Sequence, residues 1–345
     1  MCSTFFKPVV LLICLMAAQF SYAQTTDPIA ENMLVYQRSV GGWPKAVNNI
    51  KVDYNKPLTA DEKQAIKADS LHEDATFDNK ATSREINYLV TAYKKTGNKN
   101  YLAAAEKGIN YILNAQYDNG GWPQFYPDKH LYRSEITYND NAMINVLNIL
   151  QDIVDKKHDY DVVNPAFVPK AKAAVAKGID CILKTQIAVN GKLTAWCAQY
   201  DKDSLKPAKA RAFELPSIAS GESVGIVQFL MRQKNPSPEI KKSIESAMAW
   251  FEKSKIPGYK FEIIKDASQP TGKDGIVVAD PNSVTWARFY DIDTNKPQFV
   301  GRDSKPKETL AEIENERRAG YAWYGTWPQK LFDKDYPKWL ATNAK

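Results

Sequence analysis

Cysteine, histidine and long apolar runs are scarce in this 345-residue chain, and each shortage excludes a class of protein. The three histidines, His72, His130 and His158, and the four cysteines show no zinc-binding spacing. The chain has no G-x-S-x-G elbow, P-loop or G-x-G-x-x-G fingerprint. Lysine and arginine form no run of the kind that binds nucleic acid. After the N-terminal segment, no stretch is long and apolar enough to span a membrane.

The first 23 residues have the pattern of a secretory signal peptide. Lys7 precedes an apolar run over residues 8–18, and a small-x-small pattern ends at Ala23. Cys14 in that run would also allow a lipid anchor, but the isoleucine before it is bulkier than a lipobox requires. We therefore expect a secreted or periplasmic protein, cleaved after Ala23, with a single domain over residues 24–345.

Two cysteines, Cys181 and Cys197, remain after this cleavage. They could be bridged or free, because a large exported domain does not need a disulfide to fold. The formal net charge is +6, and Lys7 is the one charged residue before Gln24, so the mature chain carries +5 (+6 less 1). A mildly basic exported protein suits an acidic partner, and an acidic polysaccharide fits better than nucleic acid. We expect a monomer.

Internal repetition organises the chain. The segment K-G-I-N-Y-I-L-N-A-Q at 107–116 recurs as K-G-I-D-C-I-L-K-T-Q at 177–186, and a third stretch, Met248 to Lys255, follows at similar spacing. Their apolar residues fall on one face at the helical period. Each is preceded by another amphipathic stretch, and these lie at 82–96, 142–156 and 218–233.

These stretches predict three helical hairpins, spaced by the 70 residues that separate the first two repeats. Short connections make the two helices of a hairpin antiparallel, and no hairpin can bury its apolar face alone. The expected fold is therefore mainly α, an (α/α)3 toroid or incomplete α/α barrel. Its core candidates include Ile86, Leu89, Val90, Val146, Leu147, Leu150, Val224, Val227 and Leu230.

The last third of the chain has a different composition. Residues 257–310 are rich in proline, glycine and aspartate, with short β-like runs at Gly275–Ala279 and Gln298–Val300. We expect long loops with a little β structure, followed by a helix near 307–319. Loops of this length in a compact domain are usually functional.

Polar residues stand where the first helix of each hairpin begins. Asp78 and Asn79 precede the first helix, Asp140 the second, and Glu222 the third. Since these helices start at the same end of a toroid, carboxylates recur at one rim. Hard oxygen ligands of this kind suit calcium. Helix capping is the alternative role, because Asp and Asn accept the free N–H groups of a helix start.

Thr82 and Glu85 have the spacing of a capping box for the first of these helices. Asp78 is then not needed as a cap, which leaves its carboxylate for another role. For Asn139 and Asn141, capping is the interpretation that we favour.

Three arginines, Arg211, Arg288 and Arg302, lie in polar, loop-like surroundings. A guanidinium presents a rigid fork that matches a carboxylate. Three of them opposite an acidic rim would suit a polycarboxylate ligand bridged by calcium. The alternative is that each arginine pairs with a nearby acid. Those acids are Glu214, Asp291 and Asp303.

Three Trp-Pro steps follow glycine-containing turns, at 41–44, 120–123 and 325–328. Glycine allows a tight turn and proline stiffens its exit, so packing at hairpin turns is the favoured role for most of these rings. Trp43 or Trp122 could still line a sugar-binding groove, because rigid aromatic rings present large flat contact surfaces.

Six longer motifs extend across the chain. They are F-D-N-K-A-T at 77–82, Y-D-N-G-G-W-P-Q-F-Y-P at 117–127, I-T-Y-N-D-N-A-M at 136–143, E-L-P-S-I-A-S-G-E-S-V-G-I at 214–226, W-A-R-F-Y-D-I at 286–292 and R-R-A-G-Y-A-W-Y-G at 317–325. Together they resemble polysaccharide lyase family 10, the α/α-toroid pectate lyases. The resemblance covers residues 30–335, nearly the whole mature chain.

The resemblance implies a Ca²⁺-assisted pectate lyase that cleaves polygalacturonate by anti β-elimination and leaves 4,5-unsaturated oligogalacturonides. By motif position, Arg302 resembles the Brønsted base that removes the C5 proton. The remaining roles also follow from motif position. Asp78, Asn79 and Asp140 resemble ligands of calcium and of the catalytic centre, with Asp78 catalytic, and Arg211 and Arg288 resemble clamps on substrate carboxylates.

An arginine base conflicts with the rule that a guanidinium stays protonated, with a pKa above ~12. Nearby cations and burial would make its deprotonation less costly. Alternatively, calcium would acidify the substrate proton enough for transient transfer. The sequence leaves both explanations open.

Two other functions fit parts of the pattern. A hydrolase of uronic-acid oligosaccharides on the same scaffold would use Asp78 and Asp140 as acid and base. A non-catalytic pectin-binding protein would keep the basic charge and the aromatic rings, but it would not need Arg302 and Asp140 in matched motifs. Calcium dependence and an unsaturated product separate the lyase from both.

Overall fold

The computed structural model describes residues 26–128 and 130–343 of the chain. The predicted signal peptide, residues 1–23, lies outside this part. Within the described ranges, no helix is both long and apolar enough to cross a membrane.

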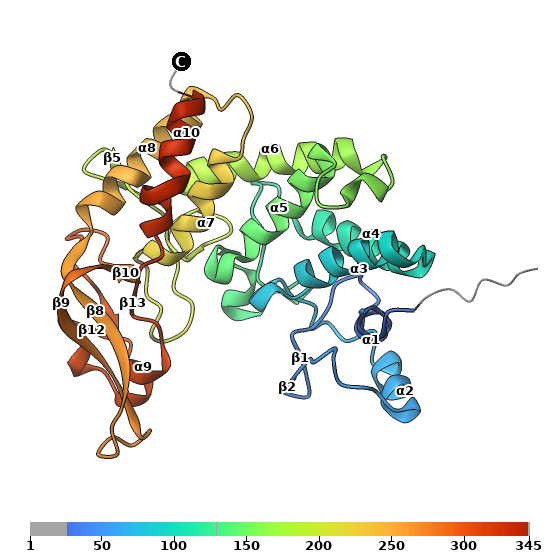
Figure 1. Ribbon diagram of the computed structural model, residues 1–345, viewed down its shortest axis with the longest axis horizontal. Helices are drawn as coiled ribbons and strands as arrows, with labels where there is room; N and C mark the ends of the chain where they lie inside the picture. The colour runs from blue at the N-terminus through green and yellow to red at the C-terminus, as the bar shows by residue number, and fades with distance from the viewer. Residues whose placement is uncertain (1–25, 129, 344–345) are drawn as a thin grey trace, which may run out of the picture.

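Three antiparallel helical hairpins form the body of the molecule, as the repeats predict (Figure 1). The hairpins are α3 (Ser83–Thr96) with α4 (Lys99–Ala115), α5 (Ala142–Asp155) with α6 (Phe167–Thr185), and α7 (Ser220–Met231) with α8 (Pro238–Lys253). The predicted toroid of three hairpins is confirmed. The repeated segments that predicted the second helices are only the C-terminal parts of longer helices.

The helices form two layers. The first helices of the hairpins, α3, α5 and α7, contact one another in chain order, and α1 (Pro28–Tyr36), α4, α6 and α8 do the same. The core lies between the layers, where eight of the nine core candidates are buried and Val224 is half-buried. Burying apolar faces between the layers stabilises hairpins that could not fold singly.

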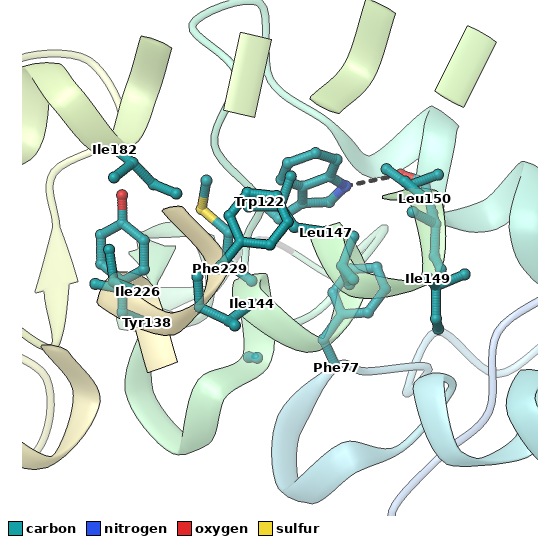
Figure 2. Close-up of a cluster of buried hydrophobic side chains, with 14 of the residues drawn as sticks. Phe77, Trp122, Tyr138, Ile144, Leu147, Ile149, Leu150, Ile182, Ile226 and Phe229 are labelled. Carbon is teal, nitrogen blue, oxygen red and sulfur yellow. Dashed lines mark hydrogen bonds between the residues drawn. The ribbon is translucent and has the colours of Figure 1, made fainter. Parts of the chain in front are cut away.

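A buried tryptophan follows every helix of the second layer. Each indole N–H donates to a carbonyl in the last turn of the preceding helix, at 2.7–2.8 Å. The pairs are Trp43 with Met33, Trp122 with Ile112, Trp196 with Ile182, and Trp286 with Phe251. Figure 2 shows the indole of Trp122 inside the core beside Leu147. The structure therefore repeats this device four times, although only two of these tryptophans stand in a G-G-W-P motif.

The repeated K-G-I segments and the repeated G-G-W-P turns pack against each other. A Cβ on Gly41 would lie 2.5 Å from the carbonyl oxygen of Lys107, and a Cβ on Gly120 would lie 2.0 Å from that of Lys177. Glycine in each G-G-W-P turn thus allows close approach to the K-G-I segment of the next helix in the layer. Gly178 of that segment in turn makes room for the ring of Trp122.

Glutamines at the ends of three second-layer helices join neighbouring units. Each side-chain amide donates to a carbonyl of its own turn and to a carbonyl of the next helix in the layer. Gln37 reaches Gly41 and Ala104, Gln116 reaches Gly120 and Ala174, and Gln186 reaches Thr194 and Ser243. The second acceptor in each case lies inside the next helix of the layer, so each glutamine ties one unit to its neighbour.

The capping box predicted for α3 is wrong. Thr82 has a φ of +63°, and its hydroxyl accepts the backbone N–H of Trp43 at 2.9 Å. The carboxylate of Glu85 is buried, where it accepts from the hydroxyl of Tyr54 and pairs with Arg84. Both side chains serve tertiary contacts with the preceding unit, which outweigh local capping.

The C-terminal third contains more β structure than its composition suggests. β8 (Ile256–Lys265) and β9 (Lys273–Ala287) form a long antiparallel hairpin, and β13 (Tyr324–Gly325) pairs with β9. The β structure expected in this region is therefore present, and most of it lies in this one hairpin, with loops and two-residue strands beyond it. Residues 280–283 form an irregularity in β9 opposite Gly258, which is a position where a strand tolerates proline.

The helix predicted near 307–319 is shorter in the structure, where α9 covers Asn315–Gly320. The last helices are a π-helical segment, Leu331–Asp335, and α10 (Tyr336–Asn343), and α2 (Ala60–Ala68) lies near the N-terminus. The remaining strands each have two residues. They are β1 (Ala46–Val47), β2 (Ile50–Lys51), β3 (Ile136–Thr137), β4 (Ala188–Val189), β5 (Lys192–Leu193), β6 (Gln199–Tyr200), β7 (Ile218–Ala219), β10 (Phe289–Tyr290), β11 (Phe299–Val300) and β12 (Pro306–Lys307).

The two cysteines, Cys181 and Cys197, are buried free thiols. Burial raises the pKa of the Cys181 thiol to about 12, so it stays protonated and unreactive at neutral pH. Of the two alternatives, bridged or free, the structure shows the free cysteines.

Replacing Gly120 with alanine is expected to destabilise the protein by about 3 kcal/mol or more, because the new Cβ would overlap the carbonyl of Lys177 at a φ of +91°. Gly191→Ala is the matched control. Its φ is +75°, but no atom lies within 4 Å of the added Cβ, so it should lose only about 1 kcal/mol. Urea unfolding of both variants measures the difference, and equal losses would contradict the contact.

Candidate active site

Two turns of the same shape stand before α3 and α5. The 3-10 turns Asp78–Lys80 and Asn139–Asn141 both place their second and third residues in the left-handed region, at φ of +52° and +65° in the first and +52° and +58° in the second. Asn and Asp enter this region more readily than other non-glycine residues. The shared geometry puts Asn79 and Asp140 at equivalent positions, and both are exposed at the rim.

The carboxylates predicted at one rim do come together. The pKa of Asp140 is raised, first by partial loss of water around its carboxylate and then by the negative charges of Asp78 and Glu222. Arg288 and Arg211 oppose this rise. Asp78 is buried and forms an ion pair with Lys45. The side chains that begin three separate hairpins therefore share one electrostatic environment.

This rim has the chemistry for a hard cation, although the protein does not supply a complete ligand shell. Among the described residues, no three His, Cys, Asp or Glu side chains gather closely enough to hold a metal ion. Two carboxylates repel each other there, and Asn141 Oδ1 and Glu222 Oε2 are buried without a hydrogen-bond partner in the described chain. Asp78, Asn79 and Asp140 fit a cation that takes further oxygens from a ligand or water.

A cavity of about 180 Å³ opens beside Asp140. Glu222 and Arg288 lie in its wall as a largely buried ion pair. Burial alone would lower the pKa of Arg288, but the charge of Glu222 raises it, so this guanidinium stays charged. Its Nε–H is buried with no partner in the described chain. The cavity wall thus holds a charged guanidinium beside Asp140, with one N–H that has no partner in the described chain.

The predicted sugar-contacting role of Trp43 and Trp122 is wrong. Both rings are 0 % exposed, and both indole N–H groups are used inside the core. The third Trp-Pro step, at 327–328, is the one at the site. Trp327 is half-exposed and lines the cavity, packed near Gly221. Nothing in the three similar motifs distinguishes a ring in the core from a ring at the cavity.

Arg211 and Arg302 differ in how they are held. Arg211 forms a two-pronged pair with buried Glu214, as the local-pairing alternative proposed, and this pair raises its pKa. Arg302 is 57 % exposed and pairs with Glu316, which raises its pKa, and not with the expected Asp303. Of these two arginines, only Arg211 is among the charges that chiefly set the pKa of Asp140.

Arg317 was not singled out from the sequence, yet it is the most unusual cation of the site. It is 8 % exposed, and its Nε and Nη2 groups have no hydrogen-bond partner in the described chain. Burial lowers its pKa, and the charges of Arg302 and Arg211 lower it further. A buried cation with unused donors is costly unless an anion binds there. In the sequence Arg317 is followed by Arg318, and nothing there shows which of the two is paired.

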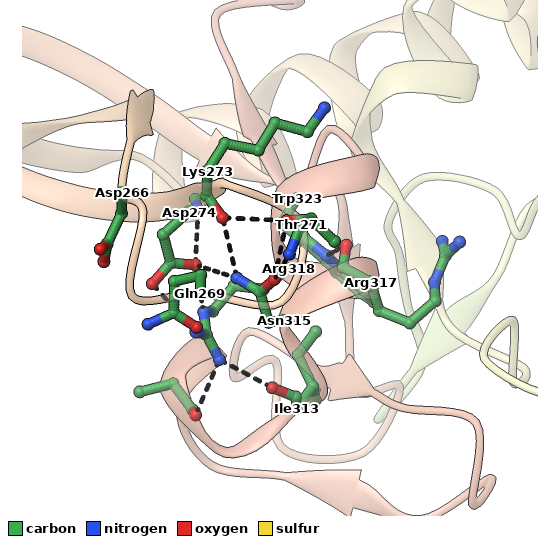
Figure 3. A network of polar contacts seen from close by, with 12 residues as sticks. Asp266, Gln269, Thr271, Lys273, Asp274, Ile313, Asn315, Arg317, Arg318 and Trp323 are labelled. Atoms are coloured by element: carbon green, nitrogen blue, oxygen red, sulfur yellow. Dashed lines mark hydrogen bonds and ion pairs between the residues drawn. The ribbon is translucent and has the colours of Figure 1, made fainter.

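Arg318, the second arginine of that pair, holds α9 and therefore Arg317 in place. Arg318 forms a bidentate pair with Asp274 of β9, at 2.6 and 2.9 Å, and Asn315 also bonds to this strand. Figure 3 shows Arg318 reaching into this network while Arg317 extends the other way. The β8–β9 hairpin therefore anchors α9 and sets the position of Arg317.

Comparison with known families and structures gives a consistent result. A profile of the family described as "Pectic acid lyase" matches residues 37–332. A mutant of a family 10 polysaccharide lyase from Cellvibrio cellulosa, in complex with trigalacturonic acid, is 36 % identical, covers 88 % of this chain and 90 % of its own, and superposes with a TM-score of 0.77. A second structure of a family 10 polysaccharide lyase from Cellvibrio cellulosa is 34 % identical over 90 % and 92 %, also at 0.77. No curated protein matches the chain.

The Arg211–Glu214 pair predicts a loss of stability in acid. Burial alone would raise the pKa of Glu214, but hydrogen bonds and charge from Arg211 bring it below the usual 4.5. A carboxyl whose pKa is lower in the folded state adds stability above its unfolded pKa and loses it as the pH falls through the folded pKa. Glu214→Gln should therefore destabilise the protein at pH 7 but flatten the fall in unfolding free energy below pH 4.5. Urea unfolding between pH 3 and 7 measures this, and parallel curves would contradict it.

Arg317→Met should stabilise the fold by about 1–3 kcal/mol, because removing buried donors that have no partner outweighs the loss of the contacts with the rings of Phe213 and Tyr321. Arg318→Met is the control, since it breaks a satisfied buried pair with Asp274 and should be destabilising. Thermal unfolding of both variants without ligand gives the comparison. A less stable Arg317→Met protein would mean that the guanidinium is satisfied.

Proposed function

The chain belongs to the pectic acid lyase family and is a family 10 polysaccharide lyase, and from this premise we propose that it cleaves polygalacturonate by Ca²⁺-assisted β-elimination. The observation that carries the proposal is an acidic rim, Asp78 with Asp140, beside arginines that have unused donors. A polyuronate carries one carboxylate per sugar, so it can meet both a rim-bound cation and a guanidinium. The similar lyase that holds trigalacturonic acid supports this substrate class.

Asp78, Asn79 and Asp140 are the residues that would hold calcium in this proposal. Their oxygens are of the type that calcium prefers, and the number they offer leaves room for a substrate carboxylate. The ion would act as a Lewis acid that stabilises negative charge on the substrate carboxylate next to C5. Lys45 forms an ion pair with Asp78, so this carboxylate already attracts one positive charge.

The chain's own residues then orient the sugar and move one proton. A base removes the C5 proton, the electron pair forms the C4–C5 double bond, and the bond from C4 to the glycosidic oxygen breaks. The leaving oxygen takes up a proton. Arg288 and Arg317 would bind carboxylates through donors that lack partners within the described chain. Trp327 would support a sugar ring.

The base in this proposal is an arginine. Motif position favours Arg302, whereas the influence of Arg211 on Asp140 favours Arg211. Burial cannot ease deprotonation of Arg302, because its side chain is exposed, and carboxylates raise the pKa of both groups. An arginine that is normally protonated can accept the C5 proton only transiently. The proton must therefore be made acidic, by stabilising the negative charge that develops on the substrate. We propose that Arg211 carries this role and that Arg302 binds substrate.

Export fits this substrate, since polygalacturonate is a polymer outside cells. We propose that the chain is cleaved after Ala23 and acts as a single catalytic domain, residues 24–345, in the periplasm or beyond. N-terminal sequencing of the protein isolated from its host would test the cleavage site.

The decisive measurement mixes residues 24–345 with polygalacturonate at alkaline pH, first with calcium and then with a chelator. A new double bond conjugated to the carboxylate absorbs ultraviolet light. We expect absorbance to rise only with calcium. Arg211→Ala should lower kcat by at least ~10², whereas Arg302→Ala should mainly raise KM. The reverse pattern would return the base to Arg302.

Two other outcomes would contradict the proposal. Reducing ends without new absorbance would indicate a hydrolase, with Asp78 and Asp140 as acid and base. Binding without any product would indicate a pectin-binding protein. Asp180→Asn is the matched control for rim variants, because this carboxylate is exposed on α6 and pairs only with Lys184 among the described residues.

A further inference from the structure

One aromatic ring contacts three arginines. The guanidinium carbons of Arg317, Arg211 and Arg302 lie 3.6, 4.9 and 5.2 Å from the centre of the Phe213 ring. The ring is 2 % exposed. The three arginines come from separate parts of the chain: the segment before β7, the segment after β11, and α9. Phe213 is therefore the point where three otherwise unconnected cations meet.

The charges of this cluster do not balance. Glu214 pairs with Arg211 and Glu316 with Arg302, but Arg317 has no ion pair among the described residues. Burial lowers its pKa and the charge of Glu316 opposes this, but the other two cations lower it again, so the arginines repel one another. Some attraction must offset this repulsion for the cluster to persist without a ligand.

An aromatic face supplies such an attraction without using up the donors. The negative face of a phenyl ring attracts a guanidinium electrostatically. A carboxylate in the same place would accept the N–H groups and neutralise the charge, leaving nothing to bind an anion. Phe213 instead leaves the edge of Arg317 free, in agreement with its two unpartnered groups.

The ring itself is held by Tyr321. Its ring lies edge-on to Phe213 at 5.8 Å, and its hydroxyl donates to Glu214 at 3.1 Å. Arg288 and Arg317 lie over the face of Tyr321 at 4.7 and 4.9 Å. The two rings thus connect the Arg288 side of the cavity with the three arginines around Phe213.

We propose that Phe213 is a positioning residue: its face gathers Arg211, Arg302 and Arg317 into one site for the carboxylates of the substrate. The inference rests on the proposed function for the nature of the ligand, but not for the arrangement of the arginines. Phe213 contacts no substrate in this account and acts only through the guanidinium groups.

The test compares Phe213→Leu with Phe299→Leu. Phe299 is equally buried, at 2 %, and its ring contacts Trp323 and Tyr324, while Arg211, Arg302 and Arg317 lie over Phe213. Both variants lose a ring, so both should lose a similar amount of thermal stability. We expect Phe213→Leu to lower kcat/KM for polygalacturonate on the order of 10–100-fold and to weaken trigalacturonate binding on the order of 10-fold, the equivalent of losing one or two cation–π contacts. Phe299→Leu should change each by less than about 3-fold.

Rescue distinguishes the ring face from simple packing. Phe213→Tyr keeps the face and should restore at least half of the activity. If Phe213→Leu and Phe299→Leu lose activity equally, or if Phe213→Tyr is as impaired as Phe213→Leu, the positioning role is wrong.

A measurement without substrate separates this inference from the proposed function. Arginine Nε–H signals in ¹H–¹⁵N spectra report whether the guanidinium groups are ordered. Arg211, Arg302 and Arg317, assigned by single replacement, should give sharp signals in the wild type and in Phe299→Leu, and broadened ones in Phe213→Leu. An inactive wild type with this pattern would contradict only the proposed function. Unchanged signals in Phe213→Leu would contradict the positioning role.

Discussion

The close packing of a glycine turn and its tryptophan against the next helix of the layer is the contact on which the rest of the structure depends. Each turn reaches a neighbouring backbone where only glycine fits, and each indole hydrogen-bonds the helix that it follows. These contacts set the spacing between hairpins. Backbone N–H groups of Trp43 and Trp196 also donate to Thr82 and Ser223 at the starts of α3 and α7, so the same contacts help to decide where the rim residues stand. The acidic rim is thus a consequence of how the units stack.

The site is a place where like charges are held together against their repulsion. The charge of Asp78 raises the pKa of Asp140 at the rim, and four arginines lie over two aromatic rings, Phe213 and Tyr321. Such an arrangement lowers stability, and a rigid core is needed to maintain it. The two-layer helical body and the Asp274–Arg318 ion pair provide that rigidity. A ligand that carries both a cation and carboxylates would relieve the strain on both sets of charges.

The helical body could be predicted because its signals are local and repeated. The period of Ile86, Leu89 and Val90 predicts a buried helix face without knowledge of any partner. The rim carboxylates Asp78 and Asp140 followed from that, since equal hairpins must begin at one end. Family motifs added the reaction class, which spacing alone could not supply.

The failures share a physical cause, which is that tertiary contacts decided the outcome. Thr82 and Glu85 fit a capping pattern but bond to a preceding unit. Trp122 and Trp327 have similar neighbours in sequence, and only the fold buries one and exposes the other. Arg317 stands beside Arg318, and the two point to opposite sides of a short helix. No sequence period distinguishes a charge that is paired from one that is left free.

The two matched turns before α3 and α5 have a wider consequence. Asn79 and Asp140 occupy equivalent positions on nearly identical backbone, yet one side chain is neutral and the other is charged. The backbone therefore accepts either residue, and the electric charge of the rim is independent of the architecture that presents it. Exchanging Asn and Asp at either turn would therefore change the charge of the rim by one unit without changing the toroid.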